Sequence, residues 1–364
     1  MKRLSTLQLQ PGMILGKDIY SHDDQLILPS GFCLTDRAIT RLELYAVPFV
    51  FIKEYNNDTA EPEEDNAETI PEQPYSVRLR QSEEFKQFSA NFQEDVDIIK
   101  NALNDVVEKN APLDVDTLLQ ETLSLLDEHQ SSFHIFDMLH NMRNFDDITY
   151  THGLNVGLIC NVLATWLKFP PEDVELATQC GLLHDLGKLK IPEKILKKPE
   201  KLTDFEFEII KTHPVESHKI LKKCNVNPHI LNAALMHHER CDGSGYPYHL
   251  TGDKIDKFAK IVAIADAYDA MTSARVYRGA MCPFEVVRIF EEEGLQKYDT
   301  KFIMTFLENI VITYLSHRVR LSDGRIGTVV FVNSRALSRP IVRCGDTYVD
   351  LSKEPPTLVI QEIL

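Results

Sequence analysis

The histidines of this chain are concentrated in one stretch, since eleven of the thirteen lie between His129 and His249. Several of them interrupt apolar runs that have the three- and four-residue spacing of helices. A polar side chain on such an apolar helical face needs a partner to compensate its burial. Imidazoles and carboxylates are the usual protein ligands of first-row metals. The sequence therefore predicts a helical domain that brings these side chains together around metal ions.

Two candidate ligand positions lie in segments that are apolar almost throughout. Asp266 lies in residues 261–268, where an unpaired buried carboxylate would cost several kcal/mol or lose its charge. His184 and Asp185 end another apolar helical stretch, which we expect to stop at Gly187. The alternative explanation for Asp266 is a structural ion pair. A His-Asp dipeptide considered alone is weak evidence for a metal site.

Four further histidines are ambiguous when each is considered alone. His237 and His238 end an apolar helical pattern, and His152 and His213 are each followed by one. Each could be a satisfied core histidine. Together with the groups above they are too many uncompensated polar side chains for one apolar core, so we interpret the set as a metal site.

The charge distribution limits the partners that we expect. The formal net charge is −16, and residues 54–76 carry eight Asp/Glu and no Lys or Arg. Residues 185–223 carry ten Lys/Arg against seven Asp/Glu, so a phosphate-bearing small molecule is allowed there. No basic, aromatic-interleaved stripe occurs, which argues against a nucleic-acid partner.

The cysteines and the apolar runs indicate where the protein works. Seven scattered cysteines without Cys-x-x-Cys spacing are typical of a reducing compartment. Neither an apolar leader segment nor an 18-residue apolar run occurs. We therefore expect a soluble, cytoplasmic protein without membrane insertion.

The patterns along the chain predict a mainly α protein with a small module at each end. The expected segments are a small α/β module at 1–53, an acidic Pro- and Glu-rich linker at 54–76, a helical connector at 77–128, the helical metal-binding domain at 129–312 and a small β module at 313–364. The last segment is assigned because the spacing of its apolar residues changes from the helical period of three to four to the strand period of two. Asp323-Gly324 and Gly345-Asp346 are the expected hairpin turns.

The clearest helix prediction covers residues 82–109. Apolar residues recur there at spacings of three and four and form one stripe: Phe85, Phe88, Phe92, Val96, Ile99, Leu103 and Val106. Two interpretations are open. The stripe packs on its own domain, or it pairs with a second copy in a homodimer.

The order of these motifs resembles the HD-GYP family of bacterial cyclic di-GMP phosphodiesterases, a branch of the HD metal-dependent phosphohydrolases. The resemblance covers roughly residues 130–310 and rests on His152, His184-Asp185, Gly187-Lys188, His213, His237-His238-Glu239, Asp242 to Pro247, and Asp266. It implies an all-helical HD-type metallohydrolase domain. It also implies that the metal ligands are His152, His184, Asp185, His213, His237, His238 and Asp266. Asp185 would bridge two divalent first-row cations, iron or manganese by ligand type.

The resemblance implies further roles near the metals. Asp185 and Lys188 would be the catalytic residues, with Lys188 stabilising charge on the scissile phosphate or its leaving oxygen. A lysine that complements a helix dipole is the alternative for Lys188. Arg275 and Arg278 would hold the phosphates of the substrate, because the guanidinium fork suits phosphate oxygens. Solvated arginines would have the same sequence pattern.

A glycine-rich loop follows the paired histidines and comprises Asp242, Gly243, Ser244, Gly245, Tyr246 and Pro247. The resemblance implies that Tyr246 contacts a guanine or shapes the entrance, and that protein partners dock at this Gly-Tyr-Pro loop. The alternative is a bare turn in which Gly243 and Gly245 have positive φ.

Two positions depart from the family pattern. Cys241 stands where a tryptophan is frequent, so one aromatic wall of the loop is missing. Ile148 stands where members with three metals carry a glutamate, and it cannot coordinate a cation. We therefore expect two cations, with Asp146 orienting a ligand or a metal-bound water, and with Asp147 pointing away.

The activity implied by the resemblance is hydrolysis of cyclic di-GMP to pGpG and/or GMP, with a metal-activated water as nucleophile. Two alternatives stay open at this stage. The first is an HD phosphohydrolase that acts on another cyclic dinucleotide or nucleotide. The second is a non-catalytic cyclic di-GMP receptor or docking protein that uses the Gly-Tyr-Pro loop. The intact ligand set favours catalysis, because a pure receptor does not need every ligand.

Overall fold

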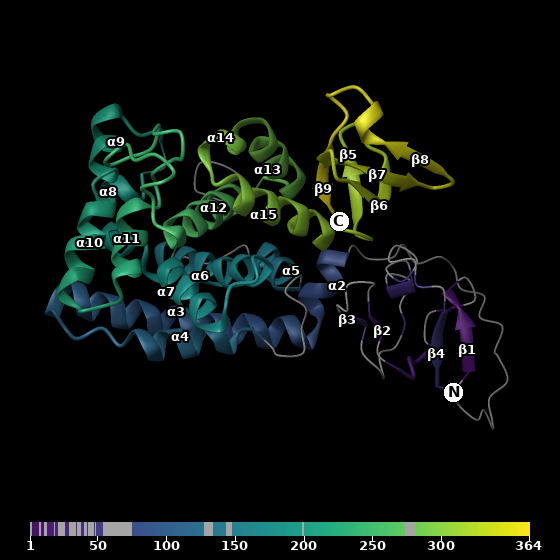
Figure 1. Ribbon diagram of the computed structural model, residues 1–364, viewed down its shortest axis with the longest axis horizontal. Coiled ribbons are helices and arrows are strands. Elements are labelled where there is room, and N and C mark those ends of the chain that lie inside the picture. Colours follow the sequence, from purple (N-terminus) through teal and green to yellow (C-terminus); the bar gives the residue numbers. More distant parts are fainter. Residues whose placement is uncertain are drawn as a thin grey trace. The chain divides into compact units, whose positions relative to one another are not determined.

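The chain divides into two compact units, Met1–Glu72 and Gln73–Leu364, each with its own apolar core. The computed structural model describes residues 75–126, 134–142, 148–198, 200–273 and 281–364, together with parts of 2–53 (Figure 1). The boundary between the units lies inside the predicted acidic linker. The predicted connector (77–128), helical domain (129–312) and β module (313–364) contribute to one common core. The boundaries between these three segments therefore stay predictions.

The first unit contains two antiparallel strand pairs. Strand β1 (Lys2–Ser5) pairs with β4 (Phe49–Ile52), and β2 (Ile19–Tyr20) pairs with β3 (Leu26–Leu28). Burial alternates along β4, as expected for a strand with one face on a core. The helix expected in this module lies largely outside the described residues.

The second unit is helical up to residue 313. Its helical elements are α2 (Tyr75–Gln81), α3 (Glu83–Lys109), α4 (Val115–Ser124), α5 (His134–Asn141), α6 (Ile148–Trp166), α7 (Pro171–Leu183), η2 (Leu186–Lys190), α8 (Glu193–Leu196), α9 (Asp204–Ile210), α10 (His213–Lys223), α11 (Pro228–Met236), α12 (Lys257–Thr272), α13 (Pro283–Ile289), η3 (Phe290–Gly294), α14 (Leu295–Lys297) and α15 (Thr300–Thr313).

Helices α6, α7, α11 and α12 pack against one another and form the centre of this unit (Figure 1). The approach of α6 to α7 depends on small residues. A Cβ atom added at Gly181 would lie 2.8 Å from the Val156 carbonyl oxygen and 2.9 Å from Cys160 Sγ. Glycine there brings the two backbones together one turn before His184, which sets the position of the predicted metal ligands.

The apolar stripe of α3 is buried within its own unit. Phe92 and Val96 are fully buried, and the other members of the stripe are exposed by less than a tenth of their surface. Helix α3 contacts α2, α4, α6 and η2. The interpretation that the stripe packs on its own domain is confirmed, and the stripe is not available to a second copy. The expected homodimer through the 82–109 helix is not tested and stays a prediction.

The chain ends in an antiparallel five-stranded sheet with the order β8-β7-β6-β5-β9. Its strands are β5 (Arg318–Leu321), β6 (Ile326–Asn333), β7 (Ala336–Cys344), β8 (Thr347–Asp350) and β9 (Ile360–Ile363), with the 3-10 turn η4 (Leu351–Lys353) between the last two. Gly324 and Gly345 have positive φ in the turns that precede β6 and β8. The predicted fold class, helical with a small C-terminal β module, is confirmed.

Candidate metal centre

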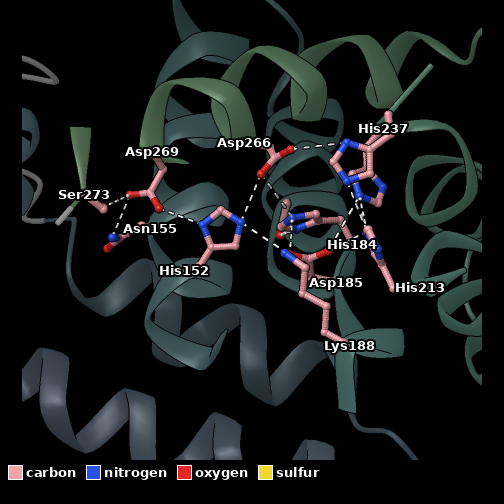
Figure 2. Close-up of polar contacts among 12 residues, drawn as sticks. His152, Asn155, His184, Asp185, Lys188, His213, His237, Asp266, Asp269 and Ser273 are labelled. Atoms are coloured by element: carbon pink, nitrogen blue, oxygen red, sulfur yellow. Dashed lines mark hydrogen bonds and ion pairs between the residues drawn. The ribbon is translucent and has the colours of Figure 1, made fainter. Parts of the chain in front are cut away.

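The seven predicted ligands converge from six helical segments of the second unit, and Figure 2 labels six of the seven side chains. His152 lies on α6 and Asp266 on α12, whereas the others lie at helix ends, where the backbone turns inward. His184 caps α7, Asp185 precedes η2, His213 begins α10, and His237 and His238 follow α11. Six of the seven are buried, and the His238 side chain is 17% exposed.

Asp185 lies at the middle of this cluster, and its two oxygens face different imidazoles. Oδ2 lies 3.4 Å from His152 Nε2 and 3.2 Å from His184 Nε2. Oδ1 lies 3.1 Å from His213 Nε2 and 3.6 Å from His237 Nε2. The carboxylate therefore has one oxygen directed to each of two sets of nitrogen ligands, as a bridging ligand would.

The remaining contacts complete two groups of three ligands, each with its donor atoms within 4.8 Å of one another. The first half of the centre contains His152, His184 and Asp266, with Asp266 Oδ1 3.1 Å from His152 Nε2. The second half contains His213, His237 and His238. In it, His213 Nε2 lies 3.2 Å from His237 Nε2 and 3.1 Å from His238 Nε2.

Backbone carbonyls fix the orientation of three of these imidazoles. Nδ1 of His184 lies 2.6 Å from the Gly181 oxygen, and Nδ1 of His213 lies 2.7 Å from the Ile210 oxygen. Nδ1 of His237 lies 3.0 Å from the Ala234 oxygen. A carbonyl can only accept, so in each case Nδ1 carries the proton and Nε2 presents its lone pair to the cluster.

Several atoms at the middle of the cluster are buried and lack hydrogen bonds. They are Nε2 of His152, Nε2 of His184 and Oδ1 of Asp185, considering the described part of the chain. Buried polar atoms without partners are rare in native proteins. Cations coordinated by the two halves would satisfy all three atoms, so the donor set fits metal ions.

Comparison with known families agrees with this geometry. The family model described as "HD domain" matches residues 116–302, which is just over half of the chain. The chain belongs to the HD domain family. The predicted HD-type helical domain is thereby confirmed, and the proteins of this family that hydrolyse phosphate esters depend on metals.

Among the relatives of this HD protein are two curated bacterial phosphodiesterases. Cyclic di-GMP phosphodiesterase PA4108 of Pseudomonas aeruginosa is 36% identical over 203 residues, which cover 56% of this chain and 49% of the relative. 3'3'-cGAMP-specific phosphodiesterase 1 of Vibrio cholerae is 41% identical over 145 residues, which cover 40% of this chain and 34% of the relative. The chain thus spans about half the length of these relatives or less.

A solved structure, the HDG"Y"P protein Bd1817 of Bdellovibrio bacteriovorus, aligns over 85% of this chain and 99% of its own length. The TM-score is 0.47 at 17% sequence identity. Within the described residues of the HD protein, no helix is both long enough and apolar enough to cross a membrane.

The electrostatics of the HD centre prepare its side chains for cations. Burial acts to raise the pKa of Asp185, but the neighbouring His184 and Lys188 side chains hold that pKa well below its usual range. Burial lowers the pKa of His237 to about 4. The carboxylate is therefore ionised and the imidazole neutral, which are the protonation states that metal ligands require.

Asp269 belongs to the HD centre although the sequence did not single it out. Its Oδ2 lies 2.7 Å from His152 Nδ1, and its Oδ1 accepts hydrogen bonds from Asn155 (2.8 Å) and Ser273 (3.1 Å), as Figure 2 shows. Burial acts against protonation of His152, yet the surrounding carboxylates raise its pKa well above its ordinary value. Asp269 therefore orients His152 and increases its basicity. The available signal was the spacing from Asp266, since residues three apart share a helix face.

Lys188 lies beside the bridging carboxylate, as predicted. Its Nζ donates a hydrogen bond to Asp185 Oδ2, and its side chain is 18% exposed. The side chain comes from η2, which follows Asp185 directly, so the lysine reaches back by one turn. A positive charge is thus held at the edge of the cluster, while its role in catalysis stays a prediction.

The Gly-Tyr-Pro loop covers the second half of the centre. The Tyr246 ring stacks on His238, with centroids 4.6 Å apart and an interplanar angle of 24°. Gly243 has a φ of 79°, as the bare-turn alternative requires, but Gly245 does not have positive φ, so that part of the alternative is wrong. Gly245 is needed for another reason, because a Cβ there would lie 2.4 Å from the backbone of residues 238–240.

Glu239 holds the end of this loop, a role that the sequence did not reveal. Its buried carboxylate accepts hydrogen bonds from the backbone amides of Tyr248 (2.7 Å) and Leu250 (2.9 Å). Asp242 forms an isolated β-bridge with Thr251 in the same region. The loop that carries Tyr246 is thereby tied to the helix end that carries His237 and His238.

Four predicted positions are not placed by the structure. Arg275 and Arg278, the predicted phosphate ligands, lie outside the described residues, and so do Asp146 and Asp147. Ile148 is the first residue of α6. The predictions that depend on these side chains are therefore untested.

Proposed function

We propose that this chain is a metal-dependent phosphodiesterase that hydrolyses cyclic di-GMP to pGpG and/or GMP. The observation that supports it most directly is the division of the Asp185 carboxylate between two sets of imidazoles. This arrangement suits two cations that share one ligand. The Pseudomonas aeruginosa relative, which is named a cyclic di-GMP phosphodiesterase, supports the choice of substrate.

Iron or manganese is the metal that we propose. Imidazole nitrogens and carboxylate oxygens suit divalent first-row cations, and among the described residues no thiolate takes part in the cluster. The first half of the centre would hold one cation and the second half the other, with Asp185 shared. When bound, the cations would polarise the phosphoryl oxygens and lower the pKa of a water molecule, which supplies a nucleophile at neutral pH.

The chain's own residues would position the substrate against these cations. Lys188 places a protonated amine next to Asp185, where it can donate to a phosphoryl or leaving oxygen. Tyr246 presents an aromatic ring above His238, which suits contact with a guanine. Arg275 and Arg278 are proposed to hold the phosphates by charge-assisted hydrogen bonds.

A panel of cyclic dinucleotides tests this function. Metal-loaded protein should hydrolyse cyclic di-GMP, and Asp185→Ala should bind less metal and lose several orders of magnitude in rate while circular dichroism stays unchanged. Asp116→Asn, an exposed position on α4, is the control and should retain activity. Binding of cyclic di-GMP without turnover by the metal-loaded wild type would instead identify a receptor.

A different cyclic dinucleotide is the second candidate substrate. It is favoured by the Vibrio cholerae relative named as specific for 3'3'-cGAMP, which is 41% identical over the aligned residues. Faster turnover of 3'3'-cGAMP than of cyclic di-GMP in the same panel would establish this alternative. The metal centre would be the same for both substrates. A difference between their turnover rates would therefore report on the residues that contact the bases.

Two kinds of protein partner are also proposed. One is a second copy that pairs through the 82–109 helix, and the other is a protein that docks on the Gly-Tyr-Pro loop. Sedimentation at tens of micromolar protein tests the first, because a clean monomer would exclude it. Substitution of exposed Tyr248 beside the loop tests the second in a binding assay with a candidate partner.

A further inference from the structure

A row of four side chains crosses the C-terminal sheet on four adjacent strands. The register pairs Arg318 with Thr328, Thr328 with Arg343, and Arg343 with Tyr348. Side chains at paired positions point to the same face of a sheet. Adjacent strands are about 4.8 Å apart, so the two arginine backbones are about 10 Å apart, with the threonine between them.

This row lies on the face of the sheet that points away from the core. The alternating positions Val319, Val329, Val342 and Val349 are buried, whereas both arginines of the row are exposed and Tyr348 is 68% exposed. The row lines a depression of about 560 Å³, together with Ile326, Gly327, Gly345 and Asp346. This volume lies within the range of small-molecule sites.

The two arginines of the row differ from other arginines of the sheet. Arg320 pairs with Glu362, and Arg325 pairs with Asp323. Arg339 donates to the carbonyl oxygens of residues 351, 354 and 355. For the side chains of Arg318 and Arg343, in contrast, no hydrogen bond or ion pair to a described residue occurs. Two neighbouring guanidinium groups that form no ion pair with a described carboxylate favour an anion between them, although Asp346 lies at the rim.

The local charge agrees with an anionic ligand although the chain as a whole is acidic. Residues 313–364 contain seven Lys/Arg and five Asp/Glu, a net charge of +2, whereas the whole chain carries −16. A long polyanion would experience the repulsion of the whole chain, but a small anion responds mainly to nearby charges. A small ligand is therefore favoured over a nucleic acid.

We propose that this depression, the sheet pocket, binds a nucleotide. Its phosphate would lie between Arg318 and Arg343, where Thr328 adds a hydroxyl donor. Its base would lie on the exposed ring of Tyr348, since an aromatic ring stacks on any base. Strands β5 to β8 and the turn between β7 and β8 supply the whole pocket and contribute no residue to the metal centre, so this site is independent of the proposed hydrolysis.

The test uses the full chain and a local reporter. Tyr348→Trp keeps an aromatic surface and adds a fluorophore at the pocket, and its emission is titrated with GMP, ATP, cyclic di-GMP and pyrophosphate. We expect saturable quenching by the nucleotides at concentrations below millimolar. In this background, Arg318→Ala and Arg343→Ala should each weaken binding about tenfold, which corresponds to about 1.4 kcal/mol. Arg325→Ala, which removes a paired arginine of the same sheet, is the matched control and should change nothing.

Calorimetry with two further variants separates the base from the phosphate. Tyr348→Ala should weaken nucleotide binding about tenfold and leave pyrophosphate binding unchanged. Asp346→Asn removes the negative charge at the rim and should strengthen binding of pyrophosphate. All these side chains are exposed, so the thermal unfolding of each variant should match that of the wild type.

Three results would overturn the proposal. The first is the absence of any quenching by the four probes at millimolar concentration. The second is an equal loss of affinity in the Arg318→Ala and Arg325→Ala variants. The third is tighter binding of a single-stranded oligonucleotide than of any mononucleotide, which would identify a nucleic-acid surface instead.

Discussion

Two buried carboxylates on the helices of the second unit, Asp185 and Asp95, have opposite surroundings. Basic side chains converge on Asp185 and hold its pKa well below its usual range. Asp95 on α3 is equally buried, but burial and the nearby Glu121 and Glu94 raise its pKa to about 7. Asp185 thus stays charged among imidazoles, whereas Asp95, beside other acids, binds its proton up to about neutral pH.

The difference shows how a buried acid indicates function. A buried group that keeps its charge requires several partners, which must come from distant segments of the chain. At Asp185 and Asp266 these partners come from four helix ends and two helices. A protonated acid needs no such arrangement, and Asp95 Oδ2 has no hydrogen-bond partner among the described residues. Burial by itself therefore does not identify a site, whereas burial with converging ligands does.

The same substitution at the two acids should produce opposite results, and this is the largest effect that we expect. Asp185→Asn removes the charge that two cations would share, so metal content should fall and the rate should drop by several orders of magnitude. Asp95→Asn should leave metal content and rate unchanged. Metal analysis and a phosphodiesterase assay check both variants. Wild-type turnover by Asp185→Asn would refute the bridging role.

Lys188→Ala should have the next largest effect. Removal of one donor that stabilises transition-state charge typically costs about 10²–10³ in kcat. Because Lys188 also contacts Asp185, metal content must be measured in parallel. Lower kcat with unchanged metal content supports a catalytic role, whereas loss of metal together with rate would show that the lysine only supports the carboxylate.

Asp269→Ala should affect the centre through His152, by roughly 10- to 100-fold in metal affinity. Asp269→Asn is the informative second variant, since its amide oxygen can still accept from His152 Nδ1 but carries no charge. We expect Asn to recover part of the affinity that Ala loses. Equal metal affinity in the wild type and Asp269→Ala would show that the contact has no function in the centre.

The sequence indicates candidate ligands because polar residues on apolar helical faces are conspicuous without any structure, and the family resemblance then implies which of them would bind metal. It did not predict Asp269, because the partner of that carboxylate, His152, is 117 positions away and meets it only in the folded chain. The same limit applied to the stripe on α3, where apolar spacing predicts a helix but not what covers it. The sheet pocket depends on which residues of neighbouring strands pair. The alternation of polar and apolar residues predicts a strand but does not predict this register.

The last prediction concerns the stability contributed by Asp95 and has the smallest effect. The unfolded carboxyl loses its proton near pH 4, whereas the folded one keeps it up to about pH 7. Folding therefore takes up a proton between these values, and stability should fall as the pH rises through this window. Asp95→Asn removes this dependence, because an amide does not titrate.

The gain from Asp95→Asn should consequently depend on pH. We expect about 2 kcal/mol of added stability at pH 8, where the native aspartate must be charged in an apolar core, and little at pH 4. Urea unfolding at the two pH values measures the difference, with Asp97→Asn at an exposed position of the same helix as control. An equal gain at both pH values would mean that the side chain acts through packing. No gain at pH 8 would mean that a cation or a water already compensates Asp95, which would make its surroundings resemble those of Asp185 after all.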